Sequence, residues 1–413
     1  MSLSYARLLA RRVVRSLWFT PAAYAVLAVA VLLLAPAAAV LLPDEFNKLI
    51  GLDGVDDLLG VLANTLLAVA IFSLGIMVSS LQAAASAATP RARPLLMQDR
   101  TAQNAISVFI GGFIFAIVGT VGLSTSYFGA PARVILFMTT CLVILSVIYA
   151  LIRWIGRLSN LGDVSEVVDL LEGAADKAFA ELARRPLLGG VEMIALPEHG
   201  VPLRADRFGF VQAIDDDLFA TISAEQDVDF HLAVRPGTYV DSTTVLLKTS
   251  KALDEETARS VHRAFVIGGD RTFEADPRYC LVVLSETASK ALSPGVNDPG
   301  TAIDVLGTSL RVLAGWSSAA RETPARVTCP RLHVPRVSVE DLVVDAFRWI
   351  ARDGAGQLEV QIRLQKALAS LAAHDPVLFG AAARAMSHEA FARAKIGLAL
   401  PADVEILERF VLD

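Results

Sequence analysis

Residues Leu58–Leu81 read LLGVLANTLLAVAIFSLGIMVSSL, a run of 24 residues without a charged side chain. About 20 apolar residues are enough to carry a helix across the hydrocarbon core of a bilayer. This run therefore predicts a membrane-spanning helix. Polar and small residues interrupt its apolar background, which makes it the most informative stretch of the chain.

Three further apolar runs lie around this one, at Leu17–Leu42, Ala105–Tyr127 and Ala132–Ile152. Each is long enough to cross a bilayer as a helix. The sequence therefore predicts a membrane α-helical fold that begins with a four-helix transmembrane bundle over residues 1–157. The interiors of the runs are almost free of ionisable side chains, and this disfavours a proton-coupled carrier, which needs a buried carboxylate.

Arginines mark one side of the predicted bundle. They precede the first apolar run and follow the second and the fourth, whereas the loop Pro43–Asp57 is acidic and the loop Ser124–Pro131 is uncharged. By the positive-inside rule, four crossings place both termini in the cytoplasm of a bacterial inner membrane. The first run exceeds the roughly 7 to 15 apolar residues of a signal peptide, so we interpret it as a spanning helix. The arginines are Arg7, Arg11, Arg12, Arg15, Arg91, Arg93, Arg100, Arg153 and Arg157.

The polar and small positions of the second run have two interpretations. In the first, they let helices approach closely and hydrogen-bond across an interface. In the second, they line a narrow water-filled path once several subunits assemble, because hydroxyl side chains pass ions without a fixed charge. The candidate pore-lining residues are Asn64, Thr65, Ala68, Ser73, Ser79, Ser80 and Gln82.

The connector between the second and third runs contains Pro90 and Pro94 together with Arg91, Arg93 and Arg100. This composition favours an ordered segment rather than a loose loop. Contact with anionic lipid headgroups is one interpretation. Docking onto the part of the chain that follows the bundle is the other.

The composition excludes several classes of protein. The net charge of −6 and the pI near 5.6 argue against a nucleic-acid binder, which presents a basic face, and leave the lipid bilayer as the expected partner. The three cysteines form no CxxC pair, and the six histidines have no metal-ligand spacing. Phosphate-loop, dinucleotide, hydrolase and metalloprotease motifs are absent. We therefore expect neither an enzyme nor a cofactor, and the sequence identifies no metal ligand.

The residues that follow the bundle predict three parts. Amphipathic spacing predicts a connector helix over residues 158–188. Short apolar runs between turn residues predict a small barrel- or sandwich-like β-domain over residues 189–250. Helical periodicity predicts a mainly helical α+β domain over residues 251–413, with a strand at Arg331–Val337. The predicted helix N-caps there are Asp254, Ser338 and Asp375.

The phrase Ala291–Thr301 reads ALSPGVNDPGT and predicts a turn followed by a helix that starts at Pro299. A well-made helix-turn-helix is one interpretation. The other is a ligand or ion site in which polar side chains converge beside a helix N-terminus. The ligand-binding candidates are Glu286, Lys290, Asn297 and Asp298.

Several phrases of the chain resemble one family of bacterial predicted membrane proteins, catalogued as domain of unknown function 2254. The phrases are Ser79–Gln82, Thr89–Arg91, Gly209–Asp215, Arg235–Gly237, Arg263–Gly268 and Leu292–Pro299. The resemblance covers most of the chain and supports the membrane topology. It implies no catalytic residues. The sequence departs from the family pattern at Thr238, where an acidic residue is typical, and at Val296, where isoleucine is common.

Two functions follow from these patterns. A charge-poor bundle with one polar helix, joined to a β and then an α part, is analogous to small-conductance mechanosensitive channels. It predicts a homo-oligomeric channel or channel-like transport protein for ions or small solutes, with the cytoplasmic part as vestibule or regulator. The alternative is a membrane-anchored sensor or scaffold that binds a ligand or partner without transport.

Overall fold

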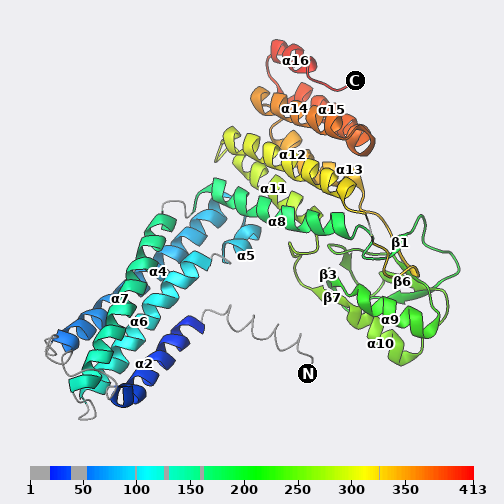
Figure 1. Cartoon of the computed structure of the whole chain (residues 1–413). Coiled ribbons are helices and arrows are strands. Elements are labelled where there is room, and N and C mark those ends of the chain that lie inside the picture. The colour runs from blue at the N-terminus through cyan, green and yellow to red at the C-terminus, as the bar shows by residue number, and fades with distance from the viewer. Residues whose placement is uncertain (1–18, 39–53, 98–99, 125–129, 159–161, 325) are drawn as a thin grey trace. The chain divides into compact units, whose positions relative to one another are not determined.

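The computed structural model describes residues 19–38, 54–97, 100–124, 130–158, 162–324 and 326–413. The chain divides into two compact units (Figure 1). The N-terminal unit comprises Met1–Ala84 and Arg93–Asp163, and the C-terminal unit comprises Ala85–Ala92 and Val164–Asp413. The N-terminal arginines and most of the acidic loop Pro43–Asp57, on which the predicted orientation depends, lie outside the described residues.

The N-terminal unit is built from long apolar helices. Its helices are α2 (Phe19–Ala38), most of α4 (Gly54–Ala87), α5 (Arg93–Leu96), α6 (Arg100–Ser124) and α7 (Ala130–Leu158). Among the described residues, the stretches Gly54–Ala84, Thr101–Ser124 and Arg133–Leu158 are long and apolar enough to cross a membrane. The apolar stretch of α2, Thr20–Ala35, is shorter. The structure therefore gives three membrane-capable helices, and the fourth crossing stays a prediction.

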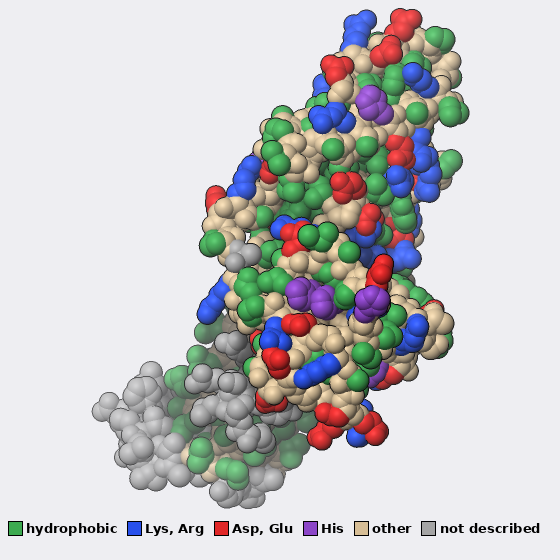
Figure 2. All heavy atoms as spheres, turned by 90° about the vertical axis from the view of Figure 1, so that its right-hand side faces the viewer, with side chains coloured by type: hydrophobic (Ala, Val, Ile, Leu, Met, Phe, Trp, Pro, Cys, Tyr) green, Lys and Arg blue, Asp and Glu red, His purple; other side chains and the backbone are tan. Residues whose placement is uncertain are grey.

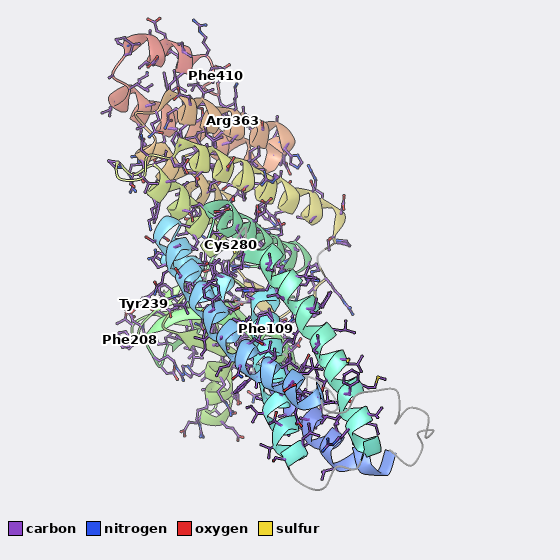
Figure 3. The ribbon with its side chains drawn as sticks, turned by 90° about the vertical axis from the view of Figure 1, so that its left-hand side faces the viewer. Phe109, Phe208, Tyr239, Cys280, Arg363 and Phe410 are labelled. Atoms are coloured by element: carbon purple, nitrogen blue, oxygen red, sulfur yellow. The ribbon has the colours of Figure 1, made fainter. Side chains whose placement is uncertain are left out.

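Helix α6 occupies the centre of the N-terminal unit. In the apolar 18-residue stretch of α6, 56% is buried, whereas the corresponding share is 22% in α4 and 22% in α7. Glycines on α6 receive side chains from the other helices: a Cβ at Gly112 would lie 2.8 Å from Leu66 Cδ1, and one at Gly111 would lie 2.7 Å from the Tyr24 ring. Phe109, which is fully buried, lies within this packing (Figure 3). Small residues on α6 thus serve close helix packing.

Large apolar side chains cover the outside of the N-terminal unit. A helix bundle in water keeps such side chains in its core, whereas a bundle in lipid exposes them. The arrangement therefore suits a bilayer. The exposed side chains include Val26, Leu33 and Leu34 on α2, Val61, Ile71 and Phe72 on α4, and Leu142, Leu145 and Ile152 on α7.

The C-terminal unit combines helices with two small sheets. Its helices are α8 (Val164–Arg184), α9 (Asp216–Gln226), α10 (Glu255–Ala264), α11 (Pro277–Ala291), α12 (Pro299–Glu322), α13 (Val339–Asp353), α14 (Leu358–His374), α15 (Pro376–Gly397) and α16 (Pro401–Glu408), with the 3-10 turn η2 (Pro90–Ala92). Its strands are β1 (Val191–Glu192), β2 (Val201–Arg204), β3 (Gly209–Ile214), β4 (Phe230–Leu232), β5 (Tyr239–Val240), β6 (Val245–Thr249), β7 (Phe265–Gly268) and β8 (Leu332–Val334).

The sheets recruit strands from far along the chain. One sheet has the order β1-β8-β4-β6-β2, and the other has the order β5-β3-β7. Strand β8 runs parallel to both β1 and β4, and therefore brings residues 332–334 beside 191–192 and 230–232. The β-structure thus reaches beyond residue 250, where the predicted β-domain ends. The predicted strand at Arg331–Val337 is present as β8.

Side-chain caps fix the helix starts of the C-terminal unit. Asp254, Ser338 and Asp375 each accept a hydrogen bond from the backbone N–H three residues on, as predicted. Pro376 and Pro401 each begin a helix. These local rules position α10, α13 and α15.

Candidate functional site

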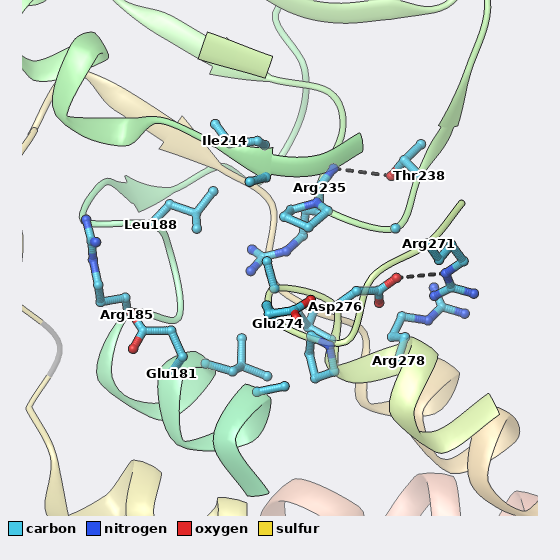
Figure 4. A pocket seen from close by; sticks show the side chains of 18 of the residues that line it. Glu181, Arg185, Leu188, Ile214, Arg235, Thr238, Arg271, Glu274, Asp276 and Arg278 are labelled. Carbon is cyan, nitrogen blue, oxygen red and sulfur yellow. Dashed lines mark hydrogen bonds and ion pairs between the residues drawn. The ribbon is translucent and has the colours of Figure 1, made fainter. Parts of the chain in front are cut away.

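A cavity of about 610 Å³ lies inside the C-terminal unit, where its sheets meet its helices. Its walls come from the C-terminal half of α8, the end of β3, the turn Arg235–Thr238 between β4 and β5, and the starts of α9, α11 and α13 (Figure 4). Leu182, Leu188 and Ile214 supply apolar wall. The volume falls within the range of about 300–1,000 Å³ that is usual for small-molecule sites.

The turn Arg235–Thr238 is held against the start of α11. Gly237 has φ +92°, and a Cβ built on it would lie 2.2 Å from Oδ2 of Asp276. Asp276 is itself buried, accepts a hydrogen bond from Arg271 Nε at 2.7 Å, and caps α11 by accepting from Tyr279 N at 3.1 Å. Only glycine satisfies both the left-handed backbone and this close approach. The turn and the helix therefore form one fixed wall of the cavity.

Five arginines line the cavity, and four of them have carboxylate partners. These pairs neutralise most of the positive charge of the lining, so they contribute little net field. The pairs are Arg185 with Asp216, Arg271 with Asp276, Arg278 with Asp341 and Asp345, and Arg336 with Glu192.

Arg235 is the fifth arginine, and among the described residues no carboxylate pairs with it. Its Nη1 donates to the carbonyl oxygens of Pro335 at 2.6 Å and Pro186 at 3.2 Å. Burial lowers the pKa of Arg235 to about 10, so the group is still protonated at neutral pH. Figure 4 shows its side chain extending from the turn toward the middle of the cavity. A partly buried cation without a counter-charge is costly, and such groups mark binding sites.

Helix α11 joins the cavity to the connector that follows α4. Its first residues, Pro277 and Arg278, line the cavity. Glu286 lies nine residues after Pro277, or about 14 Å along the helix. Glu286 forms an ion pair with Arg91, and its other carboxylate oxygen is buried and has no hydrogen-bond partner among the described residues.

The connector itself is packed rather than loose. Ala88, Thr89 and Ala92 are buried, and the Thr89 hydroxyl accepts from Arg91 N at 3.2 Å. Residues Ala85–Ala92 belong to the C-terminal unit. Of the two interpretations of this segment, docking onto the later part of the chain is therefore the one that the structure shows for Arg91.

The four ligand-binding candidates do not share a bonded cluster among the described residues. Glu286 pairs with Arg91, and Asn297 is exposed with φ +51° in the turn. Asp298 caps α12 by accepting from Thr301 N at 3.1 Å and Thr301 Oγ1 at 2.5 Å, which lowers its pKa. Lys290 is partly buried on α11 and accepts from Ser293 through its backbone. The phrase therefore builds a helix-turn-helix, and ligand binding by these residues stays a prediction.

The pore-lining candidates fall on more than one face of α4. Asn64, Ala68, Ser79 and Gln82 are exposed, and their spacing places them on one side of the helix. Thr65 is also exposed, and its hydroxyl donates to Val61 O at 2.7 Å. Ser73 is buried and Ser80 is partly buried. Within one chain, the first four lie on one exposed side of α4, which they share with the exposed apolar side chains of Val61 and Ile71, and Ser73 packs inside the unit.

Two histidines lie side by side on neighbouring strands of the larger sheet. His231 and His333 are register partners on β4 and β8, and their rings stack with centroids 4.3 Å apart. Burial, followed by the neighbouring His333, lowers the pKa of His231. Among the described residues, no three His, Cys, Asp or Glu side chains are grouped so that they could hold a metal ion. On the face that Figure 2 presents, acidic and basic side chains are interspersed.

The pair Pro236-Gly237 is a turn signal in the sequence, but no sequence pattern indicates the cavity. One available signal is Arg235 itself. Turn geometry explains Pro236 and Gly237, but it does not require a charged residue before them, so the arginine suggests another role. The remaining lining comes from α8, α9, α11 and α13, which are distant in sequence.

An apolar helix bundle, joined to a charged unit that holds a ligand-sized cavity, defines a helical membrane protein. The chain belongs to the family described as "Predicted membrane protein (DUF2254)", whose model matches residues 14–370. It is 27% identical over 254 residues to the uncharacterized proteins Mb1321c of Mycobacterium bovis and Rv1290c of Mycobacterium tuberculosis. The matches cover 57% of this chain and 47% of each relative, so the chain spans about half the length of these curated relatives. No solved structure matches the chain.

Proposed function

We propose that this protein is a membrane-anchored sensor: its C-terminal unit binds a small ligand in the cavity, and occupancy is transmitted to the membrane helices. In this proposal the C-terminal unit lies in the cytoplasm, on the side of Arg93, Arg153 and Arg157, at a bacterial inner membrane. No catalytic step is assigned to it.

One observation carries the proposal: α11 contributes both a wall of the cavity and the carboxylate that binds the connector. Pro277 and Arg278 lie at the cavity, and Glu286 pairs with Arg91. Arg91 follows the end of α4 at Ala87 by only four residues. Helix α11 packs against α8, α12 and α13, so it moves as a rigid element rather than bending. A shift at the cavity therefore reaches the end of a membrane-capable helix.

The sensor proposal is tested by filling the cavity with an introduced side chain, so that no ligand has to be known. Ala233→Trp introduces a large side chain from an exposed position on the lining and mimics occupancy. Ala180→Trp, at an exposed position on α8 outside the lining, is the matched control. The readout is hydrogen exchange of the amides of residues 88–97 in the full chain in nanodiscs.

We expect Ala233→Trp, but not Ala180→Trp, to change exchange in residues 88–97. The change should vanish when Glu286→Gln removes the ion pair with Arg91. Identical exchange in wild type and Ala233→Trp would contradict the sensor proposal, provided that the introduced tryptophan is shown to be shielded from solvent.

A second function, a homo-oligomeric channel, is favoured by the exposed polar side chains Asn64, Ser79 and Gln82 on one side of α4. In a lone chain this side would place Asn64 against lipid, which is costly for an amide. A central pore made by several copies would place it in water. The test is ion flux through the purified protein in liposomes. Flux that is lost in Asn64→Leu and kept in Ser73→Ala would support the channel, and absence of flux under voltage and tension would contradict it.

A further inference from the structure

Among the described residues, Arg235 is the cavity arginine without a carboxylate partner, although the lining as a whole has as many carboxylates as arginines. Four of the lining arginines are paired with carboxylates, as described above, whereas Arg235 bonds to backbone carbonyl oxygens. Those carbonyls belong to Pro186 and Pro335, which lie 49 and 100 residues from Arg235 in sequence. The fold thus holds this guanidinium in place without supplying an anion for it.

The free edge of Arg235 has a definite chemistry. Both carbonyls bond to Nη1, and no acceptor among the described residues bonds its Nε or Nη2. The Nε and Nη2 hydrogens form a planar fork that matches two oxygens of a carboxylate or phosphate. The turn that carries Arg235 is pinned through Gly237 to Asp276, so the fork is preorganised.

The surrounding backbone favours an anion with several oxygens. Helices α9, α11 and α13 all begin at the cavity, where Asp216, Pro277 and Ser338 line it. Helix N-termini carry partial positive charge and unpaired N–H groups, and Asp216 and Asp217 of α9 and Glu340 and Asp341 of α13 already offset part of this charge. Each cap side chain accepts from a single one of these N–H groups in its helix. A phosphoryl group offers more acceptor oxygens to these donors than a carboxylate does.

The cavity also has room for more than an inorganic anion. Its 610 Å³ is within the range of organic ligands, and the apolar wall of Leu182, Leu188 and Ile214 suits an organic group. Glu274, an exposed residue of the lining, offers an acceptor to a hydroxyl or amine on the same ligand.

We propose that the cavity binds a phosphate monoester, with the Nε and Nη2 edge of Arg235 holding two phosphoryl oxygens. This inference rests on the proposed function, because it names the ligand class of the same cavity. The phosphate group has two sources, a soluble metabolite or the headgroup of an anionic lipid. Both present the same oxygens to Arg235.

The test measures binding of inorganic phosphate and of glycerol 3-phosphate to the full chain in nanodiscs of phosphatidylcholine, by isothermal titration calorimetry. We expect saturable binding, tighter for glycerol 3-phosphate. Arg235→Gln should weaken it about tenfold or more, and Arg235→Lys should weaken it less because charge remains while the fork is lost. Arg204→Gln, an exposed arginine outside the lining, is the control and should leave it unchanged.

A second variant distinguishes a folding defect in Arg235→Gln from loss of its contact with phosphate. Ala275→Asp adds a carboxylate to the lining while keeping Arg235, and it should also weaken phosphate binding. Absence of saturable binding to wild type up to millimolar phosphate would overturn the inference. Unchanged binding in both well-folded variants would overturn it as well.

The source of the phosphate is decided by repeating the titration in nanodiscs that contain phosphatidic acid. Competition, seen as an increase in the apparent Kd for glycerol 3-phosphate, would assign the site to a lipid headgroup, and an unchanged Kd would assign it to a soluble ligand. Phosphate binding that depends on Arg235, together with unaltered exchange in residues 88–97 for Ala233→Trp, would keep this ligand assignment and reject the sensor.

Discussion

The two units of the protein satisfy their polar side chains in different ways. In the N-terminal unit, hydroxyls bond mainly within their own helix: Thr120 donates to Ala116 O, and Thr140 donates to Leu136 O. In the C-terminal unit, polar side chains bond between elements, as Arg311 does to Glu172 and Ser387 to Gln365. A membrane helix must satisfy its polar groups locally, and its assembly then depends on close packing. A water-exposed unit instead fixes its elements with specific bonds.

One side chain in each unit is an exception among its neighbours. In the N-terminal unit, the Tyr24 hydroxyl bonds to Ser146 Oγ at 2.7 Å and links α2 to α7. In the C-terminal unit, Arg235 is the cavity arginine whose charge no described carboxylate meets. The first exception ties a peripheral helix to the bundle. The second leaves binding capacity for a ligand.

The largest loss of stability is expected at Gly237 in the C-terminal unit, where the close approach of Asp276 leaves no room for a side chain. Gly237→Val forces a β-branched residue into φ +92° and against the Asp276 carboxylate. We expect it to lower the free energy of unfolding by about 3 kcal/mol or more. Gly295→Val, in open space, is the matched control and should cost far less. Chemical unfolding followed by near-UV circular dichroism measures both. Equal stability of the two variants would contradict the close approach at Gly237.

Close packing in the N-terminal unit is tested at Gly112. A Cβ there would lie 2.8 Å from Leu66 Cδ1, so Gly112→Val should destabilise the bundle by about 2 kcal/mol through overpacking. Gly75→Val on α4, where the space is open within one chain, is the control. Resistance to unfolding by sodium dodecyl sulfate in mixed micelles is the measurement. A Gly75→Val effect as large as that of Gly112→Val would show that another copy of the chain covers α4.

A pair of hydroxyl deletions tests the contrast directly. Ser387→Ala leaves Gln365 Oε1 and Leu412 N without their partner, and we expect a loss on the order of 1 kcal/mol. Thr140→Val removes a bond only to its own helix and conserves shape, so its cost should be a few tenths of a kcal/mol. Unfolding of the two units is compared in one detergent. If Thr140→Val lowered the free energy of unfolding more than Ser387→Ala does, the proposed difference between the units would be contradicted.

The smallest expected effect is a pH dependence at the stacked histidines. The folded-state pKa of His231 is depressed, so the unfolded chain binds its proton more readily. Stability is therefore complete above the unfolded pKa of about 6.5 and falls as the pH drops from there toward the folded pKa. His231→Gln should flatten this part of the pH profile, changing the melting temperature at pH 5 relative to pH 7 by about 1–2 °C. His199→Gln is the control. A profile that is identical in wild type and His231→Gln would contradict the depressed pKa.

Local rules account for what the sequence predicted well. Asp254 and Asp375 were identifiable as caps because a cap needs only its own helix. Leu58–Leu81 was identifiable as a spanning helix because length and polarity suffice, although α4 extends beyond it at both ends. The fourth crossing could not be settled in the same way, because the apolar stretch of α2 is shorter.

Long-range partners account for what the sequence missed. Arg235 was visible as a turn residue, but its burial depends on carbonyls contributed by Pro186 and Pro335. Glu286 was chosen as a polar candidate, yet its partner Arg91 lies 195 residues away. No local pattern joins such pairs, and the cavity exists only after the sheets and helices have assembled.

The position of β8 between two strands made earlier also has a consequence for synthesis of the chain. Strand β8 lies between β1 and β4, and 139 residues separate Glu192 from Leu332. At roughly 5–20 residues per second, the ribosome takes about 7–28 s to add them. Throughout this interval β1 lacks its native neighbour, and so does one edge of β4 once β4 has been synthesised. Nascent chains interrupted before Leu332 therefore present an open strand edge that invites aggregation, so the larger sheet is completed only after β8 has been synthesised.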